Sequence, residues 1–198
     1  MKFNPEKHHR HSIRLTGYDY SRAGTYFVTI CTQDRECFFG DVIENQMILN
    51  QNGIITRNCW FGLLKIFNNI QLPDVVIMPN HIHGIIIIQY QVKNHRSCRG
   101  LIHQTPDIDS IENPEWILMR IPSLTLGKVI RHFKAHATIN IRKNGAGHFQ
   151  WQRNYYEEII RNNKEMDYKR SYITNNPLEW EEDEANPKNI RKEEGLIL

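Results

Sequence analysis

The chain has 198 residues, of which 40% are hydrophobic and 24% are charged, and its formal net charge is +3. This size and composition predict one globular domain with its own core. No apolar stretch approaches the roughly 18 residues of a membrane span, and the N-terminus lacks the apolar segment of a signal peptide. We therefore expect a cytoplasmic protein without a membrane partner. The four cysteines show no zinc-ribbon spacing, which argues against a structural zinc site or a disulfide framework.

Charge is unevenly distributed along the chain. Basic residues gather in the first fifteen residues, at 93–100 and at 127–145, whereas residues 179–187 are acidic. We expect a basic N-terminal arm over about 1–15 and a charged C-terminal tail over about 179–198. Basic clusters are more often solvated faces than binding sites, so charge alone does not identify a partner.

The first half of the chain predicts three strands and one helix. Residues 24–33 are rich in β-branched and aromatic side chains and predict a strand. Apolar side chains at a spacing near 3.6 predict a helix over 50–69. Residues 73–80 and 81–90 predict two strands that a tight turn at Pro79 and Asn80 makes antiparallel. Periodicity is then lost from about 91 to 122, where we expect a variable loop or insertion.

The second half predicts two helices and one strand. Residues 123–143 have the pattern of an amphipathic helix with a basic flank. Residues 149–161 predict a strand, and 162–177 predict a helix that begins at asparagines and ends at Pro177. The order of elements predicts an α+β fold with a ferredoxin-like or RRM-like antiparallel sheet and helices on one face. The last helix is additional to that fold.

The stretch MPNHIHGIIII, residues 78–88, places two histidines at the start of an isoleucine run. In a strand, residues i and i+2 point to the same face, so His81 and His83 lie side by side and Ile82 points to the opposite layer. Two neutral imidazoles on one face can bind a divalent metal. The alternative is a pair of half-buried structural histidines at a strand end.

The last predicted helix carries Tyr172 and Asn176 on one face, with Tyr168 a turn earlier. A tyrosine on a helix is in most cases a packing residue, so this helix alone does not indicate chemistry. Beside a His-x-His strand, however, the same helix could bring a hydroxyl nucleophile and an amide oxygen to a metal site. Two imidazoles and one amide oxygen leave open positions on a metal, and open positions bind substrate.

Five stretches resemble the HUH single-tyrosine transposases and are most similar to the REP-associated tyrosine transposases of the IS200-like family. They follow the family's order over about residues 8–185: HHRHSIRLTGYDYSRAGTYFVTICTQ, VIMPNHIHGIIII, LGKVIRHFKA, WQRNYYEEIIRN and YITNNPLEWEEDE. The resemblance implies a single HUH transposase-like domain over 1–198. It also implies that His-x-His lies on a central strand and that the additional C-terminal helix carries the tyrosine.

The resemblance implies a role for each site residue. His81 and His83 would bind Mg²⁺ or Mn²⁺, Asn176 would be the third ligand, and Tyr172 would be the nucleophile. Mobile relatives resemble a YIxxQ pattern, whereas this chain has Asn176 directly before Pro177, which disfavours α geometry at the asparagine. The implied function is that of a metal-dependent single-strand DNA endonuclease and strand transferase that acts at hairpins through a 5′-phosphotyrosine. No Walker-type glycine loop is present, which agrees with rejoining without ATP.

We expect single-stranded or hairpin DNA as the partner, bound through phosphate contacts and base stacking. The residues expected to contact it are Arg131, Lys134, Trp151 and Arg153, although Trp151 is equally suited to the core. Monomer and homodimer both remain open.

Other functions are weighed against this one. A histidine-triad hydrolase would need a third alternating histidine, but position 85 is Ile. His132 and His136 stand four residues apart on the predicted basic helix and could contribute to a zinc site. The alternative from a different class is a non-cutting protein that binds hairpin or single-stranded DNA on the same fold.

Overall fold

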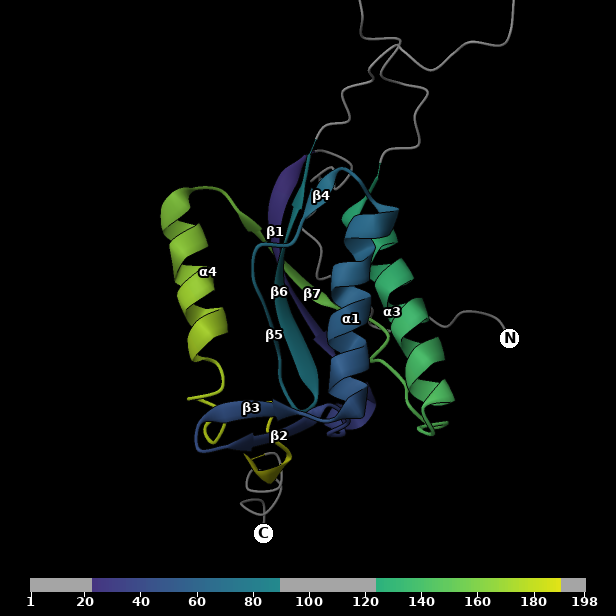
Figure 1. Cartoon of the computed structure of the whole chain (residues 1–198). Helices are drawn as coiled ribbons and strands as arrows, with labels where there is room; N and C mark the ends of the chain where they lie inside the picture. Colours follow the sequence, from purple (N-terminus) through teal and green to yellow (C-terminus); the bar gives the residue numbers. More distant parts are fainter. Residues whose placement is uncertain (1–22, 90–123, 190–198) are drawn as a thin grey trace, which may run out of the picture.

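The computed structural model describes residues 23–89 and 124–189 (Figure 1). The expected N-terminal arm and the expected insertion at 91–122 lie outside these residues. The strands are β1 (Gly24–Cys31), β2 (Gly40–Ile43), β3 (Gln46–Leu49), β4 (Ile70–Gln71), β5 (Val75–Ile77), β6 (His81–Ile88) and β7 (Tyr156–Ile160). The helices are the 3-10 turn η1 (Gln33–Arg35), α1 (Gln51–Ile66), α3 (Leu126–Lys143) and α4 (Asn163–Asn175). Within the two described ranges, no helix is long and apolar enough to cross a lipid bilayer.

A five-stranded antiparallel sheet forms the centre of the fold. The strands β6 and β1 are central, β7 pairs with the other side of β1, and β4 and β5 both pair with the outer side of β6. In the β1–β6 register, Thr29 lies opposite His83 and Cys31 lies opposite His81. The predicted α+β fold of ferredoxin-like type is confirmed, and His-x-His lies on a central strand.

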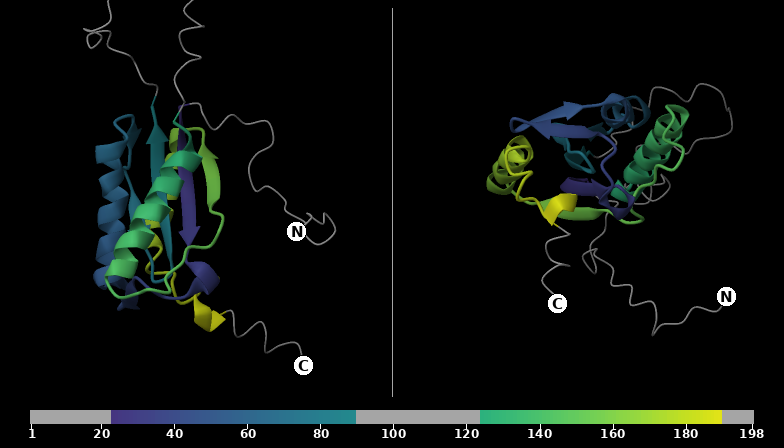
Figure 2. Two further views of the ribbon diagram at one scale, coloured as in Figure 1. Left: turned by 90° about the vertical axis from the view of Figure 1, so that its right-hand side faces the viewer. Right: turned by 90° about the horizontal axis from the view of Figure 1, so that it is seen from below.

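Helices cover both faces of the sheet (Figures 1 and 2). The helices α1 and α3 lie on one face, over a core that includes Tyr26, Val28 and Ile86. The helix α4 lies on the opposite face, where Ile173 packs with Phe27 and Ile85. Because side chains alternate along a strand, residues 81, 83 and 85 all point to the α4 face. The additional helix therefore covers the face that carries the two histidines.

Gly84 interrupts the isoleucine run because α1 approaches the sheet closely at this point. A Cβ atom on Gly84 would lie 2.5 Å from Cζ2 of Trp60 on α1. Trp60 is fully buried and packs edge-on against Phe133 of α3, so its indole has little room to move. The glycine allows a large aromatic side chain to pack directly behind the histidine pair.

Gly84→Ala should therefore lower the free energy of unfolding by about 1 to 3 kcal/mol, the usual cost of overpacking a core. Gly62→Ala is the matched control, because a Cβ atom there meets nothing within 4 Å and the position is helical. It should raise stability by up to about 1 kcal/mol. Urea denaturation of both variants measures the difference, and equal effects would contradict the packing argument.

The short strand β4 was not predicted, and two longer segments also differ from the prediction. The hairpin of β2 and β3 was not predicted, and its turn residues Glu44 and Asn45 have φ of 50° and 62°. Asparagine is common in such a turn but glutamate is not, so the usual turn signal is missing. The strand predicted over 149–161 is only Tyr156–Ile160. Phe149 and Trp151 pack in the core beside α3, and Trp151 makes a single isolated antiparallel bridge to Thr32 beyond the end of β1, so this segment pairs only there and does not form a continuous strand.

The first part of the expected charged tail is folded. Residues 176–189 form successive turns, and Trp180 and Ala185 are buried against Met78. The Arg35 side chain donates a hydrogen bond of 2.6 Å to the carbonyl of Glu184. This segment is therefore part of the domain, beside the turn between β5 and β6.

Candidate metal and tyrosine site

His81 and His83 lie side by side on β6, and both are buried. Their ring centroids are 4.6 Å apart. The Nδ1 atom of His81 is 2.9 Å from Oδ1 of Asn80, and the Nδ1 atom of His83 is 2.8 Å from Oγ1 of Thr29. In each ring, Nδ1 therefore contacts a neighbouring side chain, that of Asn80 in the turn before β6 for His81 and that of Thr29 on β1 for His83. The Nε2 atoms of both rings face the C-terminal part of the chain.

Asn80 determines the tautomer of His81. Its Nδ2 donates to the carbonyls of Arg35 and Ala185 at 2.8 Å and 2.7 Å, which sets the orientation of the amide. Its Oδ1 can then only accept, so Nδ1 of His81 carries the proton and Nε2 has a free lone pair. An outer hydrogen bond of this kind orients metal-binding histidines.

Burial keeps both histidines neutral. It lowers the pKa of His81 to about 4, against the opposing effects of the Asp183 carboxylate and the Asn176 side chain. Burial also lowers the pKa of His83 well below its usual value, and the charges of His81 and Lys169 act in the same direction. The neutral imidazole is the form that binds a metal, so both rings are ready to do so at neutral pH.

Tyr172 on α4 reaches the histidine pair. Its hydroxyl oxygen lies 3.5 Å from Nε2 of His83, and the two ring centroids are 5.1 Å apart. Phe27 stacks on His83 and meets the Tyr172 ring edge-on, so it holds both rings in place. Partial burial raises the pKa of Tyr172, and the carboxylates of Asp183 and Glu179 raise it further. The free phenol is therefore protonated at neutral pH.

The other candidate tyrosines lie elsewhere. Tyr168, one turn earlier on α4, is 66% exposed. Tyr156 on the edge strand β7 is also exposed, and Tyr155 lines a groove beside α3. Of these four tyrosines, Tyr172 is the one that contacts the histidine pair.

Asn176 follows directly after α4 and has helical φ and ψ of −53° and −39°. The expectation that Pro177 displaces it from α geometry is wrong. Pro177 instead lies within the next turn, in which the amide of Leu178 donates to the carbonyl of Asn175. The side chain of Asn176 is thereby carried into the site, where it is 1% exposed and its Oδ1 has no hydrogen-bond partner in the described part of the chain.

These donors fit a divalent ion. The Nε2 atom of His81 is buried without a hydrogen-bond partner, as is Oδ1 of Asn176. Unpaired buried polar atoms are costly, and a shared cation would satisfy both of them. The amide oxygen suits Mg²⁺ or Mn²⁺, whereas imidazole nitrogen also suits Zn²⁺ and other transition metals, so this donor set fits a divalent ion without selecting one. Among the described residues, no three His, Cys, Asp or Glu side chains gather into a metal site, so the donor set depends on Asn176.

Sequence reasoning missed the acidic residues beside this site. Tyr172 and Asn176 line a pocket of about 310 Å³ together with four carboxylates, those of Glu179, Glu182, Asp183 and Glu184. Oδ2 of Asp183 is 3.9 Å from Nε2 of His81. The signal is the acidic run over 179–187, whose composition predicts a charged tail and not the lining of a site. The role of Asn80 was also missed, although the residue stands directly before the first histidine.

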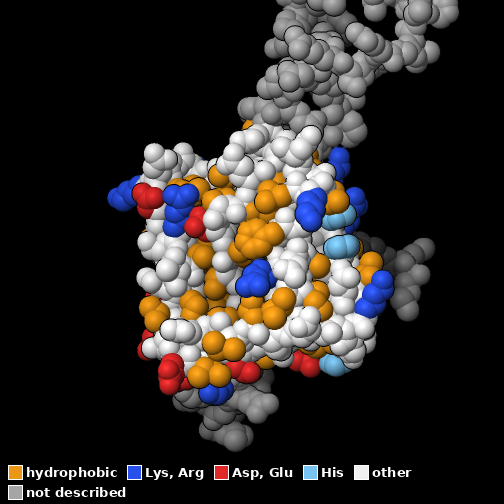
Figure 3. All heavy atoms as spheres, viewed as in Figure 1, with side chains coloured by type: hydrophobic (Ala, Val, Ile, Leu, Met, Phe, Trp, Pro, Cys, Tyr) orange, Lys and Arg blue, Asp and Glu red, His pale blue; other side chains and the backbone are white. Residues whose placement is uncertain are grey.

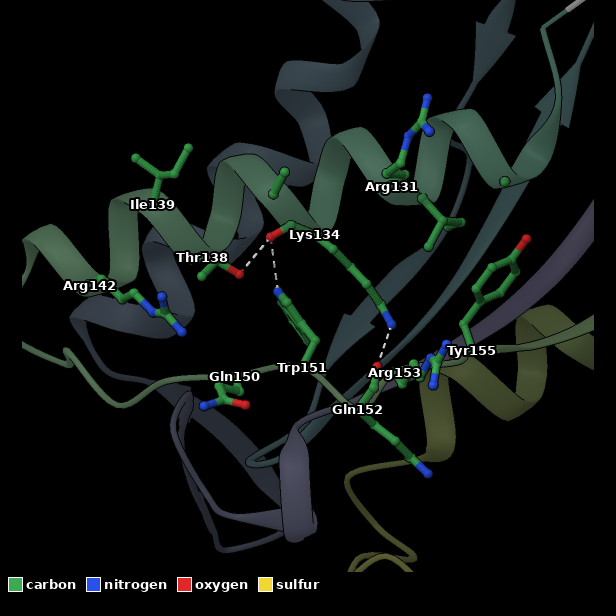
Figure 4. Close-up of a pocket in the computed structure, with 13 residues that line it drawn as sticks. Arg131, Lys134, Thr138, Ile139, Arg142, Gln150, Trp151, Gln152, Arg153 and Tyr155 are labelled. Atoms are coloured by element: carbon green, nitrogen blue, oxygen red, sulfur yellow. Dashed lines mark hydrogen bonds between the residues drawn. The ribbon is translucent and has the colours of Figure 1, made fainter. Parts of the chain in front are cut away.

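The four residues expected to contact DNA line a second cavity, a groove of about 640 Å³ between α3 and residues 150–155 (Figure 4). Arg131 and Arg153 are exposed. Lys134 donates to two backbone carbonyls of the facing segment at 2.7 Å and 2.8 Å, and burial lowers its pKa to about 8. Trp151 donates to the carbonyl of Lys134 and packs on the core. Lys134 and Trp151 therefore build the wall of this groove, while the two arginines are open to solvent.

Comparison with known proteins gives one relative by sequence. No family model matches the chain. The chain is 42% identical over 183 residues to a Haemophilus influenzae protein described as uncharacterized, and the match covers 92% of this chain and 96% of that protein.

Two solved structures are similar in fold. A REP-associated tyrosine transposase bound to a REP hairpin has a TM-score of 0.49 at 17% identity, covering 84% of this chain and 73% of that chain. A protein from Deinococcus radiodurans, described as a candidate transposase, has a TM-score of 0.41 at 10% identity, covering 82% and 96%. Because the sequence match to the Haemophilus influenzae protein spans nearly all of both chains, this chain belongs to the same family as that protein.

Proposed function

We propose that the chain is a tyrosine transposase of the HUH class, an endonuclease and strand transferase that cuts and rejoins single-stranded DNA at hairpins. The observation that carries this proposal is the contact between Tyr172 and the histidine pair, with its hydroxyl oxygen 3.5 Å from Nε2 of His83. The five sequence stretches that resemble this class, including the Tyr172 and Asn176 motif, support the same assignment.

Tyr172 is the nucleophile. Its oxygen forms a bond to phosphorus, the bond from phosphorus to the 3′ oxygen breaks, and the phenol proton ends on the released 3′ hydroxyl. The resulting 5′-phosphotyrosine keeps the energy of the broken bond, so a 3′ hydroxyl can reverse the step without ATP. Contacts with Phe27 and His83 hold the Tyr172 ring in one orientation, which reduces the entropic cost of attack.

His81, His83 and Asn176 would hold the divalent ion. When bound, Mg²⁺ or Mn²⁺ supplies charge neutralisation at the phosphate and orientation of the phosphorus. The protein residues provide neutral nitrogen donors, an amide oxygen and a partly closed surface at Tyr172. Because the pKa of the free phenol is raised, the free protein presents Tyr172 as a protonated hydroxyl.

The groove beside α3 provides a DNA contact away from the cut bond. Neither α1 nor α3 contains Asp or Glu, and Figure 3 shows Lys, Arg and His side chains gathered over these helices. The groove lies on the α3 side of the sheet, whereas Tyr172 lies on the α4 side (Figure 2). A DNA strand that contacts both has to pass around the sheet, of which β7 is one edge strand.

The test is a covalent trapping experiment. The protein is incubated with a labelled library of single-stranded hairpins and Mg²⁺ or Mn²⁺, and DNA that remains attached after denaturation is sequenced. We expect adducts that need no nucleotide triphosphate and disappear in excess chelator. Tight hairpin binding without any adduct in either metal would support the non-cutting alternative and contradict this proposal.

Arg131→Gln and Arg153→Gln should each weaken binding of single-stranded DNA severalfold. Each lost phosphate contact should also reduce the slope of log affinity against log salt by about 0.7. The matched control is Arg57→Gln, which makes the same charge change at an exposed position of α1 outside the groove. Fluorescence anisotropy at several salt concentrations measures these slopes. Equal losses in all three variants would show that overall charge, and not the groove, attracts DNA.

A further inference from the structure

The pocket beside Tyr172 has the wrong charge for DNA. Its described lining includes four carboxylates and no Lys or Arg, and it lies where a phosphate would meet Tyr172. A polyanion that entered it would be repelled unless cations compensated the charge. Two buried atoms without hydrogen-bond partners, Nε2 of His81 and Oδ1 of Asn176, belong to the adjoining site. These observations point to a cation at the boundary between the acidic pocket and the histidines.

Asp183 is the acidic residue directed at this boundary. Its Oδ2 lies 3.9 Å from Nε2 of His81, which is too long for a hydrogen bond. Its Oδ1 accepts a hydrogen bond of 2.6 Å from the backbone amide of Ala185. The side chain is only 14% exposed. One oxygen is thus occupied locally, and the other faces the free nitrogen of His81.

The position of Asp183 is set by the fold. The carbonyl of Ala185 accepts from Nδ2 of Asn80, the same residue whose Oδ1 contacts His81. On the other side, Nδ2 of Asn186 donates to the carbonyl of Trp180. The carboxylate and the imidazole are therefore held by one connected set of hydrogen bonds, although they are about a hundred residues apart in the chain.

We propose that Asp183 is a further ligand of the divalent cation, bound from the His81 side. This inference rests on the proposed function and deepens its metal site. Neighbouring ligands of one octahedral ion with bonds of about 2.1 Å lie about 3 Å apart. Oδ2 of Asp183, 3.9 Å from Nε2 of His81, would therefore have to move about 1 Å toward the histidine to bind the same ion. Nδ1 of His81 already donates to Asn80, so Nε2 is the nitrogen that is left to bind the ion. Asp183 faces this Nε2 and would bind the same ion. A carboxylate also favours Mg²⁺ and Mn²⁺ over softer metals.

The test measures Mn²⁺ binding to the full chain by electron paramagnetic resonance at neutral pH, without DNA. Asp183→Asn should weaken Mn²⁺ binding at least tenfold, because it removes the charge but keeps an oxygen for the Ala185 amide. Asp183→Ser, whose hydroxyl can also accept from that amide, is a second variant in case the first does not fold. The matched control is Glu182→Gln, which removes one carboxylate from the same pocket at an exposed position and should change Mn²⁺ affinity less than twofold.

His83→Ala separates this inference from the proposed function. If His83→Ala abolishes Mn²⁺ binding but Asp183→Asn matches Glu182→Gln, Asp183 is not a ligand and the inference is overturned while the metal site stands. If the wild type binds no Mn²⁺ that depends on His83, the metal assignment itself fails and the inference fails with it. Tenfold weakening in the Asp183 variants alone supports the inference.

Discussion

Tyr172→Phe should bind hairpin DNA as tightly as the wild type and form no covalent adduct. The substitution removes one oxygen, which is the atom that bonds to phosphorus, and leaves the ring packed against Phe27 and His83. The DNA is labelled at its 3′ end, because the protein is joined to the 5′ phosphate of the downstream fragment. A denaturing gel then reports the adduct, and peptide mapping of the wild type should place the DNA on the peptide that contains SYITNNP.

Tyr168→Phe is the control for this prediction. Tyr168 stands on the same helix one turn earlier, but its side chain is 66% exposed. This variant should keep the wild-type adduct yield. An adduct that persists in Tyr172→Phe, or one that maps to Tyr155, Tyr156 or Tyr168, would overturn the assignment of the nucleophile.

The parts of the site that could be predicted depend on local geometry or on the resemblance. Alternation along a strand is enough to place His81 and His83 on one face with Ile82 opposite, and the structure confirms this arrangement. The 3.6-residue spacing predicts α1 and α3, and asparagine caps, good helix formers and Pro177 predict α4, each to within a few residues. Periodicity does not distinguish Tyr172 from Tyr168 as the nucleophile, and that distinction came from the resemblance.

The parts that could not be predicted depend on contacts between distant segments. The Asn80 side chain bonds to Ala185, more than a hundred residues later, and no periodic pattern encodes such a contact. The acidic run at 179–184 has the composition of a solvated tail, yet Trp180 and Ala185 anchor it against Met78. Within residues 149–155, Phe149 and Trp151 contribute to the core, and the segment pairs only through the bridge from Trp151 to Thr32, so its strand-like composition does not become a continuous strand. In each of these segments, contacts with distant parts of the chain determine the structure, and the local sequence alone does not predict it.

Asn80→Ala should cause the second large effect, on both stability and the metal site. Three hydrogen-bonding partners lose Asn80: the carbonyls of Arg35 and Ala185, and Nδ1 of His81. Because Asn80 is completely buried, we expect the free energy of unfolding to fall by about 2 to 3 kcal/mol. His81 would lose the acceptor that holds its proton on Nδ1, and we expect Mn²⁺ affinity to fall by about 10 to 100-fold.

Asn69→Ala separates the loss of stability from the loss of ligand orientation. Asn69 is also nearly buried and also donates from Nδ2 to a carbonyl, that of Gln89, but it lies beyond the opposite end of β6 from the histidines. Urea denaturation should show a loss of about 1 kcal/mol, and Mn²⁺ affinity should stay at the wild-type value. If both variants weaken Mn²⁺ binding in proportion to their loss of stability, packing alone orients His81. If only Asn80→Ala weakens Mn²⁺ binding, the asparagine before the first histidine is a positioning residue of the metal site.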